Sequence, residues 1–233
     1  RCIQVSQQQY SEAQASIQPT TAKLLVFDFF AGTGSSTQAF EDAGHTVIKV
    51  ELDEHFSAHE RDIMALSAEY LIDKYGQPDF IWASPPCTAF SIAAVGHHWN
   101  PDRTPKTEAA SFNQLLVAKT LELIKELKPR KGWLMENPRG MLRKLPVVTG
   151  LTRRTITYCA YGDTRMKPTD LWGELNWTPR EACKNGMPCH EAAPRGSRTG
   201  TQGLKGAKER SRVPYELSTE VMHRVIRESD TPL

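Results

Sequence analysis

A cysteine and a glutamate, each shortly after an apolar run, could act together on an unsaturated ring. Cys87 follows two prolines after the run 79–83, and Glu136 with Asn137 follows the run 132–135. The prolines restrict the backbone before Cys87, and a thiolate is the nucleophile that a cysteine offers. A carboxylic acid in a crevice of low dielectric constant has a raised pKa, so Glu136 could protonate a ring nitrogen while Asn137 orients it. A buried structural cysteine and a salt-bridged glutamate are the alternatives.

A turn with two glycines, residues 28–34, could hold a nucleoside. It follows the apolar run 24–27 and leads into an expected helix start at 35–37. A turn without bulky side chains lets a ligand approach the backbone. Glu51, after the next apolar run 46–50, could then accept hydrogen bonds from ribose hydroxyls. The alternative is a tight turn that binds nothing, since the full G-x-G-x-x-G pattern is incomplete here.

A sheet must position these residues. Short apolar runs alternate with helical patterns to about residue 160; the runs are 24–27, 46–50, 79–83, 132–135 and 155–159. Apolar residues in 107–127 recur mostly at helical spacing, and Pro129 ends that helix. The pattern predicts an α/β fold with a doubly wound, largely parallel sheet. Ligands bind beyond the carboxyl ends of such strands, so we expect the glycine turn, Cys87 and Glu136 along one edge.

The composition is that of an ordinary globular protein. Of the 233 residues, 39% are hydrophobic and 24% are charged, which excludes a disordered or fibrous chain. The 29 basic and 27 acidic side chains give a net charge of +2, which excludes a histone-like polycation. No apolar run approaches the roughly 18 residues that a membrane helix needs, and the N-terminal residues do not resemble a secretion signal. We therefore expect a cytoplasmic protein, without membrane contact, whose five cysteines are reduced.

Composition divides the chain into four parts. Residues 1–21 are rich in Gln and Ser and predict a flexible polar arm, and residues 22–172 form the main domain. Apolar residues become sparse in 173–212, which predicts a small basic C-terminal insertion. In 213–233 apolar residues recur every four positions, which predicts a closing helix packed on the main domain.

Two stretches are strongly basic. Residues 195–212 hold six basic side chains and one acidic one, and residues 128–154 hold eight and one. Phosphate neutralisation supplies most non-specific affinity for nucleic acid, so both stretches fit a DNA backbone footprint, with solvated charged loops as the alternative. The loop 91–107 is the expected lid, and its Trp99 and histidines could contact DNA or simply be solvated.

A metal site is the remaining candidate. Cys183, Cys189 and His190 lie in a segment too poor in apolar residues to fold alone, and such segments often need a metal. Zinc would need a fourth ligand, for which Cys159 is the first candidate. The spacing is not a standard C-x-x-C pair, so a cluster without zinc stays open as the alternative.

Together, these residues resemble the DNA (cytosine-5)-methyltransferase family, and especially the short versions that bacteriophages and prophages carry. The match runs from about Leu24 to Trp172 and rests on segments in the family's order and spacing. These segments are Asp28–Gly34, Glu51, Asp62-Ile63, Pro86-Cys87-Thr88-Ala89-Phe90-Ser91 and Glu136-Asn137. The Pro-Cys-x-x-Phe-Ser and Glu-Asn segments, in order after a Phe-Ala-Gly-x-Gly turn, are a specific signal.

The resemblance implies a Rossmann-like methyltransferase fold and methyl transfer from S-adenosylmethionine to C5 of a flipped-out cytosine in double-stranded DNA. Cys87 would attack the ring, and Glu136 with Asn137 would act on its N3. The cofactor would be held by Asp28, Phe30, Ala31, Gly32, Thr33, Gly34, Glu51, Leu52, Asp62, Ile63, Ser84 and Pro85. The DNA would be contacted by Ser91, Arg165, Lys167, Arg195, Arg198 and Lys205. We expect a monomer, and the biological role stays open between restriction–modification, gene regulation and phage DNA modification.

Departures from the family pattern keep different functions open. Pro138 stands where the family has Val, and Lys167 stands where it has an arginine. Residues 173–212 replace a large target-recognition domain, which favours a short or relaxed target sequence. The nearest rival is an amino-methyltransferase acting on an exocyclic nitrogen, because Ser84-Pro85-Pro86 resembles its motif. Cys87 occupies the position of the aromatic residue in that motif, which argues against it. An RNA cytosine methyltransferase and a non-catalytic nucleic-acid-binding protein also stay open.

Overall fold

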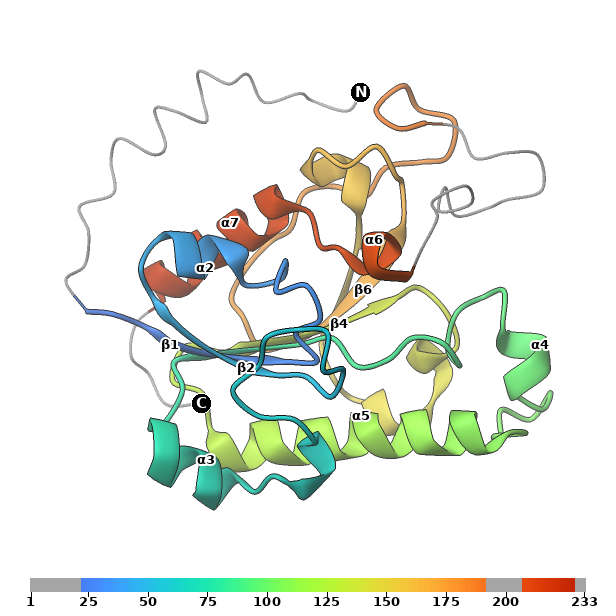
Figure 1. Ribbon diagram of the computed structural model, residues 1–233. Coiled ribbons are helices and arrows are strands. Elements are labelled where there is room, and N and C mark those ends of the chain that lie inside the picture. Colours follow the sequence, from blue (N-terminus) through green and yellow to red (C-terminus); the bar gives the residue numbers. More distant parts are fainter. Residues whose placement is uncertain (1–21, 192–206, 229–233) are drawn as a thin grey trace.

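A six-stranded sheet forms the centre of the computed structural model, which describes residues 22–191 and 207–228 (Figure 1). The strands are β1 (Leu25–Phe29), β2 (Thr46–Val50), β3 (Phe80–Ala83), β4 (Trp133–Pro138), β5 (Arg153–Thr157) and β6 (Pro168–Gly173). Their order across the sheet is β2-β1-β3-β4-β6-β5. The first four pair in parallel, whereas β6 pairs antiparallel with both β4 and β5. The expected doubly wound, largely parallel sheet is therefore confirmed.

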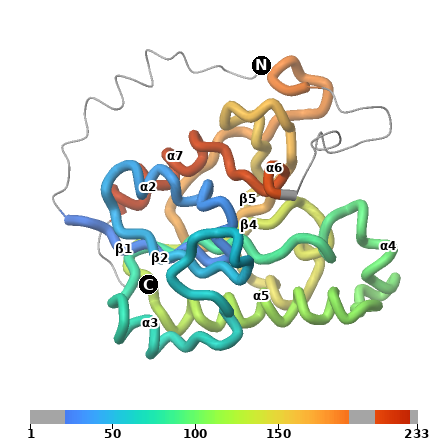
Figure 2. Tube along the Cα trace, in the orientation of Figure 1, coloured from blue at the N-terminus to red at the C-terminus, as the bar shows by residue number. Residues whose placement is uncertain are grey.

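Helices cover both faces of the sheet and give three layers (Figure 1). They are α2 (Gln38–Asp42), α3 (Ala68–Tyr75), α4 (Val95–His98), α5 (Glu108–Leu127), α6 (Ala207–Ser211) and α7 (Tyr215–Arg227). α2 and α7 pack together on one face, and α3 and α5 pack together on the other. α4 lies in the connection between β3 and α5, beyond the end of the sheet (Figure 2).

The central strand β1 shows how the sequence separates two cores. Successive side chains point to opposite faces of a strand. Phe27 and Phe29 therefore join the core beneath α3 and α5, whereas Val26 joins the core beneath α2 and α7. Asp28 also faces α2, although it is completely buried. A carboxylate inside the central strand needs hydrogen-bond partners, and the start of α2 supplies them.

The helix expected over 107–127 is confirmed as α5. The Thr107 hydroxyl oxygen accepts a hydrogen bond from the backbone N–H of Ala110 at 3.3 Å, which caps the first turn. Lys128 ends the helix in the left-handed conformation with φ 47°, directly before Pro129. The local signals therefore fix both ends of this helix.

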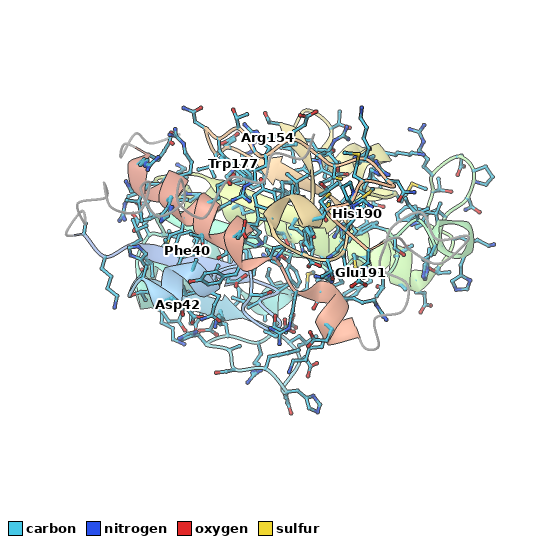
Figure 3. All side chains as sticks on the ribbon, turned by 90° about the horizontal axis from the view of Figure 1, so that it is seen from above. Phe40, Asp42, Arg154, Trp177, His190 and Glu191 are labelled. Carbon is cyan, nitrogen blue, oxygen red and sulfur yellow. The ribbon has the colours of Figure 1, made fainter. Side chains whose placement is uncertain are left out.

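The helix α7 lies within the range 213–233, where a closing helix is expected. Leu217, Val221 and Val225 lie on one face at intervals of four residues and are completely buried. They share a core with Phe40 of α2 and with Trp177, and these two aromatic side chains lie on opposite sides of α7 in Figure 3. The C-terminal helix therefore completes the layer that covers β1.

The sequence pattern does not predict β6. This strand begins with a proline and contains Asp170, and neither residue is typical of a strand inside a sheet. Asp170 is fully buried and forms an ion pair with Arg143, which follows β4 along the chain. The observed fifth strand also ends at Thr157, two residues before the expected end at Cys159. Pairing between distant segments decides both features.

Several expectations concern residues that the structure does not describe. The arm at 1–21 and the basic residues Arg195, Arg198 and Lys205 lie outside the described residues. The four-part division of the chain stays a prediction. Within 22–191 and 207–228, no helix combines the length and apolar character that crossing a membrane requires.

The packing of α7 predicts the effect of a cavity. Leu217→Ala should lower the free energy of unfolding by about 2–5 kcal/mol, because a fully buried side chain leaves a void that the core cannot close completely. Leu115→Ala on α5 is the control, since Leu115 is 57% exposed and the change should stay within about 0.5 kcal/mol. Urea unfolding followed by circular dichroism measures both values. Equal effects would contradict the observed packing.

Candidate active site

The glycine turn after β1 is held by the end of β2. The backbone N–H groups of Phe30 and Ala31 donate to the carbonyl oxygen of Val50 at 2.8 and 3.1 Å. The N–H of Gly32 donates to Oε2 of Glu51 at 2.8 Å. The turn and the acid expected at the ribose are therefore in direct contact, although they lie about twenty residues apart in the sequence.

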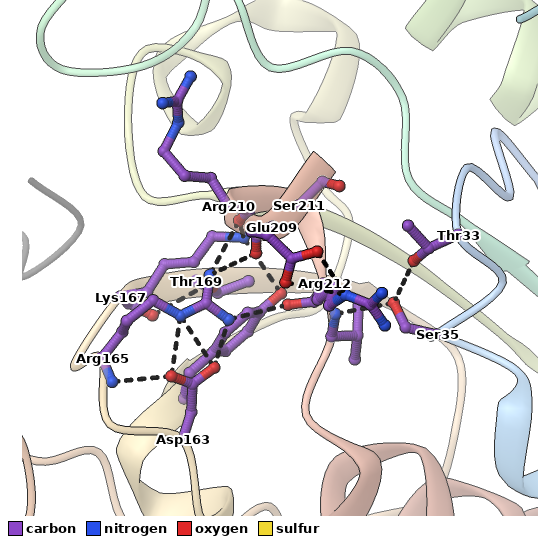
Figure 4. Close-up of polar contacts among 12 residues, drawn as sticks. Thr33, Ser35, Asp163, Arg165, Lys167, Thr169, Glu209, Arg210, Ser211 and Arg212 are labelled. Carbon is purple, nitrogen blue, oxygen red and sulfur yellow. Dashed lines mark hydrogen bonds and ion pairs between the residues drawn. The ribbon is translucent and has the colours of Figure 1, made fainter. Parts of the chain in front are cut away.

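The backbone at position 34 of this turn favours glycine. Gly34 has φ +73°, and a Cβ atom there would come within 2.8 Å of Nζ of Lys49. Lys49 is itself paired with Glu41 of α2 at 2.8 Å. Next to Gly34, the Thr33 hydroxyl donates to Oγ of Ser35 at 3.1 Å (Figure 4). The turn therefore presents mostly backbone at the edge of the sheet.

Asp28 supports the turn from inside. Its Oδ2 accepts hydrogen bonds from the hydroxyls of Ser36 and Thr37 at 2.9 and 2.6 Å. Burial raises the pKa of Asp28 to about 6, although these two hydrogen bonds oppose the shift. Asp28 therefore ties β1 to the start of α2, and direct contact with a cofactor stays a prediction for this residue.

The other residues expected at the cofactor follow β2 and β3. Leu52 is 67% exposed, and the exposed Asp62 caps a short 3-10 turn that begins with the buried Ile63. The backbone N–H of Ser84 donates to the last residue of β1 at 2.9 Å, so Ser84 and Pro85 begin beside the glycine turn. The ends of three neighbouring strands thus bring the expected cofactor residues to one edge of the sheet.

The loop that carries Cys87 is anchored from β4 and from α5. The side-chain amide of Asn137 donates to the carbonyl oxygen of Pro85 at 2.8 Å. Asn113 of α5 donates to the Thr88 hydroxyl at 3.1 Å. Two following backbone N–H groups donate to the carbonyl oxygen of Cys87 at 3.0 Å. Cys87 is therefore held in a fixed, partly exposed position at the end of β3.

The expected lid loop is fastened at its base. Trp99 is 4% exposed, stacks on Phe90 with ring centroids 5.9 Å apart, and donates from Nε1 to the carbonyl oxygen of Ala89 at 2.7 Å. A Cβ atom at Gly140 would lie 2.1 Å from the carbonyl oxygen of Phe90, so the loops after β3 and β4 touch through backbone. The suggestion that Trp99 contacts DNA is wrong for this structure, because the ring is buried under its own loop.

Glu136 lies in a buried polar cluster. The Tyr158 hydroxyl donates to Oε1 of Glu136 at 3.0 Å, and Nζ of Lys167 lies 3.9 Å from the same oxygen. Burial raises the pKa of Glu136, whereas the positive charge of Lys167 and the Tyr158 hydrogen bond oppose the shift. Burial also raises the pKa of the Cys87 thiol, the negative charge of Glu136 raises it further, and Lys167 lowers it. The thiol, the acid and the ammonium group are therefore electrostatically coupled.

Arg165 and Lys167, expected at the DNA, are both buried, being 6% and 7% exposed. Nζ of Lys167 donates to the carbonyl oxygen of Arg210 at 3.2 Å and lies 4.4 Å from the ring centroid of Tyr158 (Figure 4). Arg165 pairs with Asp163, and its guanidinium also donates to the carbonyl oxygens of Glu209, Arg210 and Arg212. Both side chains therefore fasten α6 to the site, and their contact with DNA stays a prediction.

The basic stretch 128–154 is partly neutralised inside the protein. Arg143 pairs with the buried Asp170, and Arg130 pairs with Asp79 at 2.8 Å. Ser91, the other described residue expected at the DNA, is half-buried and forms a backbone bridge with Gly140. The surface available to phosphates is therefore smaller than the number of basic residues indicates.

Sequence reasoning did not single out Tyr158. No local pattern connects this residue with Glu136, which lies 22 positions earlier. The contact forms because β6 pairs with both β4 and β5 and brings their ends together. The proposed metal ligands Cys159, Cys183, Cys189 and His190 also converge, within 4.8 Å of one another.

Two sequence comparisons point to one family. A family model described as C-5 cytosine-specific DNA methylase matches residues 24–147. A probable DNA (cytosine-5)-methyltransferase of Frog virus 3 (isolate Goorha) is 27% identical over 218 residues, which cover 85% of this chain and 99% of the viral protein.

Solved structures are more distant. The Entamoeba histolytica methyltransferase EhMeth matches 74% of this chain, with a TM-score of 0.48 and 13% sequence identity. The S. pombe Dnmt2 methyltransferase matches 69% of this chain, with a TM-score of 0.44 and 15% sequence identity. These matches span 58% and 52% of the two solved chains, which is less than two thirds of their length.

The coupling between Glu136 and Cys87 predicts how the thiol reacts. Iodoacetamide should label Cys87 slowly at neutral pH, and faster as the pH rises toward the raised pKa of the thiol. Glu136→Gln removes a negative charge, which lowers the pKa of Cys87 and should speed labelling severalfold, since one pKa unit changes the thiolate fraction about tenfold. Mass spectrometry of the Cys87 peptide gives the rate.

Glu122→Gln is the matched control for this experiment. The Glu122 side chain is 59% exposed on α5, and its removal should leave the labelling rate of Cys87 unchanged. Slower labelling in Glu136→Gln than in the unchanged protein would contradict the coupling.

Proposed function

The chain belongs to the C-5 cytosine-specific DNA methylase family, and we propose that it transfers a methyl group from S-adenosylmethionine to C5 of cytosine in double-stranded DNA. The observation that carries the proposal is the contact between two strand ends. Asn137, next to Glu136, donates to the carbonyl oxygen of Pro85 at 2.8 Å and so holds the Cys87 loop beside the acid. Binding of nucleic acid alone requires neither a thiol nor a buried acid there.

The residues at the glycine turn fit the proposed cofactor. In the half-buried Glu51 carboxylate, Oε2 accepts a hydrogen bond from the N–H of Gly32, and Oε1 accepts one from the N–H of Asp53. Each oxygen therefore keeps a lone pair that could accept a hydrogen bond from a ribose hydroxyl. The exposed carboxylate of Asp62 next to the buried Ile63 suits the edge of an adenine ring. S-adenosylmethionine, when bound, supplies an electrophilic methyl group.

Cys87 and Glu136 would activate the cytosine ring together. C5 of cytosine is too weak a nucleophile to accept a methyl group unaided. The Cys87 thiolate forms a bond to C6 while N3 takes a proton from Glu136, and electron density moves to C5. After methylation, the C5 proton passes to solvent water, cleavage of the Sγ–C6 bond restores the ring and the thiolate, and the N3 proton returns to Glu136.

The environment of Glu136 supports both states of this acid. Burial favours the protonated carboxylic acid, which is the form that donates to N3. Lys167, 3.9 Å away, and the Tyr158 hydroxyl stabilise the carboxylate once the proton has left. The same ammonium group lowers the pKa of the Cys87 thiol and so favours the thiolate.

DNA would approach the same edge of the sheet. A cytosine inside a duplex cannot reach Cys87, so the base must leave the stack, at a cost of about a few kcal/mol. α6, which Lys167 and Arg165 fasten beside Glu136, carries exposed basic side chains. We assign phosphate contacts to this helix and to the basic segment before it.

A mechanism-based trap tests the covalent step. With S-adenosylmethionine and duplex DNA containing 5-fluorocytosine, the protein should form an adduct that survives denaturation, because fluorine at C5 cannot leave as a proton does. Cys87→Ala should abolish the adduct, whereas Cys2→Ala, which removes a thiol elsewhere in the sequence, should preserve it. A denaturing gel with labelled DNA measures the adduct.

Different results would point to different functions. Methyl transfer to an exocyclic nitrogen without an adduct would favour an amino-methyltransferase. An adduct with RNA alone would change the substrate class. Neither an adduct nor methyl transfer on DNA or RNA would favour a binding protein on the same scaffold.

The cofactor assignment predicts a second result. Glu51→Gln should weaken binding of S-adenosylmethionine roughly tenfold or more, because hydrogen bonds to a charged acceptor are worth about 1.5–3 kcal/mol. Glu54→Gln, at an exposed position three residues later, should bind as the unchanged protein does. Isothermal titration calorimetry measures both affinities. Unchanged affinity in Glu51→Gln would remove Glu51 from the cofactor site.

A further inference from the structure

Three cysteines and a histidine gather beside the turn that follows β5. The ligand atoms of Cys159, Cys183, Cys189 and His190 all lie within 4.8 Å of one another. Sγ of Cys183 lies 3.1 Å from Sγ of Cys189, and Nδ1 of His190 lies 3.7 and 3.6 Å from these two sulfur atoms. Two segments more than twenty residues apart thus bring four potential metal-ligand atoms, three sulfur and one nitrogen, close together.

This donor set and its spacing fit a tetrahedral zinc ion. With Zn–S bonds of about 2.3 Å and Zn–N bonds of about 2.0–2.1 Å, neighbouring ligand atoms lie about 3.4–3.8 Å apart. The two sulfur-to-nitrogen distances already fall in that range, and small side-chain rotations would equalise the others. Magnesium and calcium prefer oxygen ligands, whereas three thiolates with one imidazole select zinc. We propose that these four residues form a structural zinc site.

Beyond Arg180, the surrounding segment has little regular structure or burial to hold its shape. Residues 174–191 contain neither helix nor strand, and after Trp177 no side chain in them is fully buried. Arg180 pairs with Glu216 and Glu220 of α7. Beyond Arg180, the backbone ties to the rest of the protein include the N–H of Cys183, which donates to the Thr157 hydroxyl at 2.8 Å, and the N–H of Glu191, which donates to the carbonyl oxygen of Thr164 at 2.9 Å. A metal joining Cys159 to the other three ligands would fix this segment to the end of β5.

The position of the site suggests what the metal stabilises. Cys159 follows Tyr158, whose hydroxyl donates to Glu136 at 3.0 Å. His190 and Glu191 end the described part of this segment (Figure 3). The zinc ion would therefore fix the turn beneath the acid to the segment that ends at Glu191. All four ligand positions are filled by protein, so the ion would be structural and not catalytic.

Metal binding has a defined proton balance. Each of the three thiols must lose its proton to bind as a thiolate, and His190 binds as a neutral imidazole. Zinc uptake by the reduced, metal-free chain should therefore release protons, to an extent that depends on pH. Chelation of the ion takes the protons back and should lower the midpoint of thermal unfolding.

Metal analysis of the full-length protein tests the site. Protein purified under reducing conditions should contain one zinc ion per chain by mass spectrometry of the elements. Cys183→Ser and His190→Ala should each lose most of this zinc. Cys87→Ser and His55→Ala are the matched controls, because they remove a thiol and an imidazole outside the cluster and should keep one ion per chain.

Measurements on the unchanged protein keep the proposal testable even if a ligand variant fails to fold. Cobalt(II) added to the metal-free chain should give the intense visible absorption of tetrahedral thiolate coordination. Absence of zinc from the purified protein together with no uptake of zinc or cobalt would overturn the proposal. A mass lowered by two hydrogens, with Cys183 and Cys189 joined in one peptide, would replace the metal site by a disulfide. None of these readouts depends on methyl transfer, so this test and that of the proposed function can fail separately.

Discussion

The hydrogen bond from Asn137 to the carbonyl oxygen of Pro85 is the constraint on which the site depends. Backbone pairing between β3 and β4 ends at Ala83 and Met135. The two prolines that follow Ser84 have no N–H group and cannot continue the ladder. A side-chain amide therefore takes over the connection between the strands, and it does so one residue after Glu136. It fixes the start of the loop that carries the thiol, whereas Asn113 and the backbone contact at Gly140 hold the rest of that loop.

Near that connection, a positive charge offsets the effect of burial on the pKa values of Cys87 and Glu136. The buried Glu136 carboxylate and the partly exposed Cys87 thiolate would repel each other, and burial favours the neutral form of each group. Lys167 supplies the opposing positive charge and is itself fixed by the Tyr158 ring and by the carbonyl oxygen of Arg210. The basic residues near the site thus have two roles. Some tune the reacting groups and anchor α6, and others remain exposed toward the solvent.

The sequence predicted the elements whose signals are local. The helix over 107–127 has its cap at Thr107 and its stop before Pro129, and the structure agrees at both ends. β6 was missed because it begins with a proline and contains Asp170, whose burial becomes favourable only when Arg143 lies opposite. Trp99 was misjudged for a related reason: its burial requires the Phe90 ring beneath it. Each of these features depends on partners that a local pattern does not contain.

The sequence by itself determined the α/β class, the order of the strand ends and the residue types that could do chemistry there. It did so because turns, prolines and apolar periodicity act over a few neighbouring residues. Only the tertiary structure decided that Lys167 and Tyr158 surround Glu136 and that Arg165 fastens α6. It also decided that Cys159 lies beside Cys183, Cys189 and His190, which come from a distant segment. These contacts arise from the antiparallel insertion of β6 between β4 and β5, whose free energy comes from pairing and burial across the whole sheet.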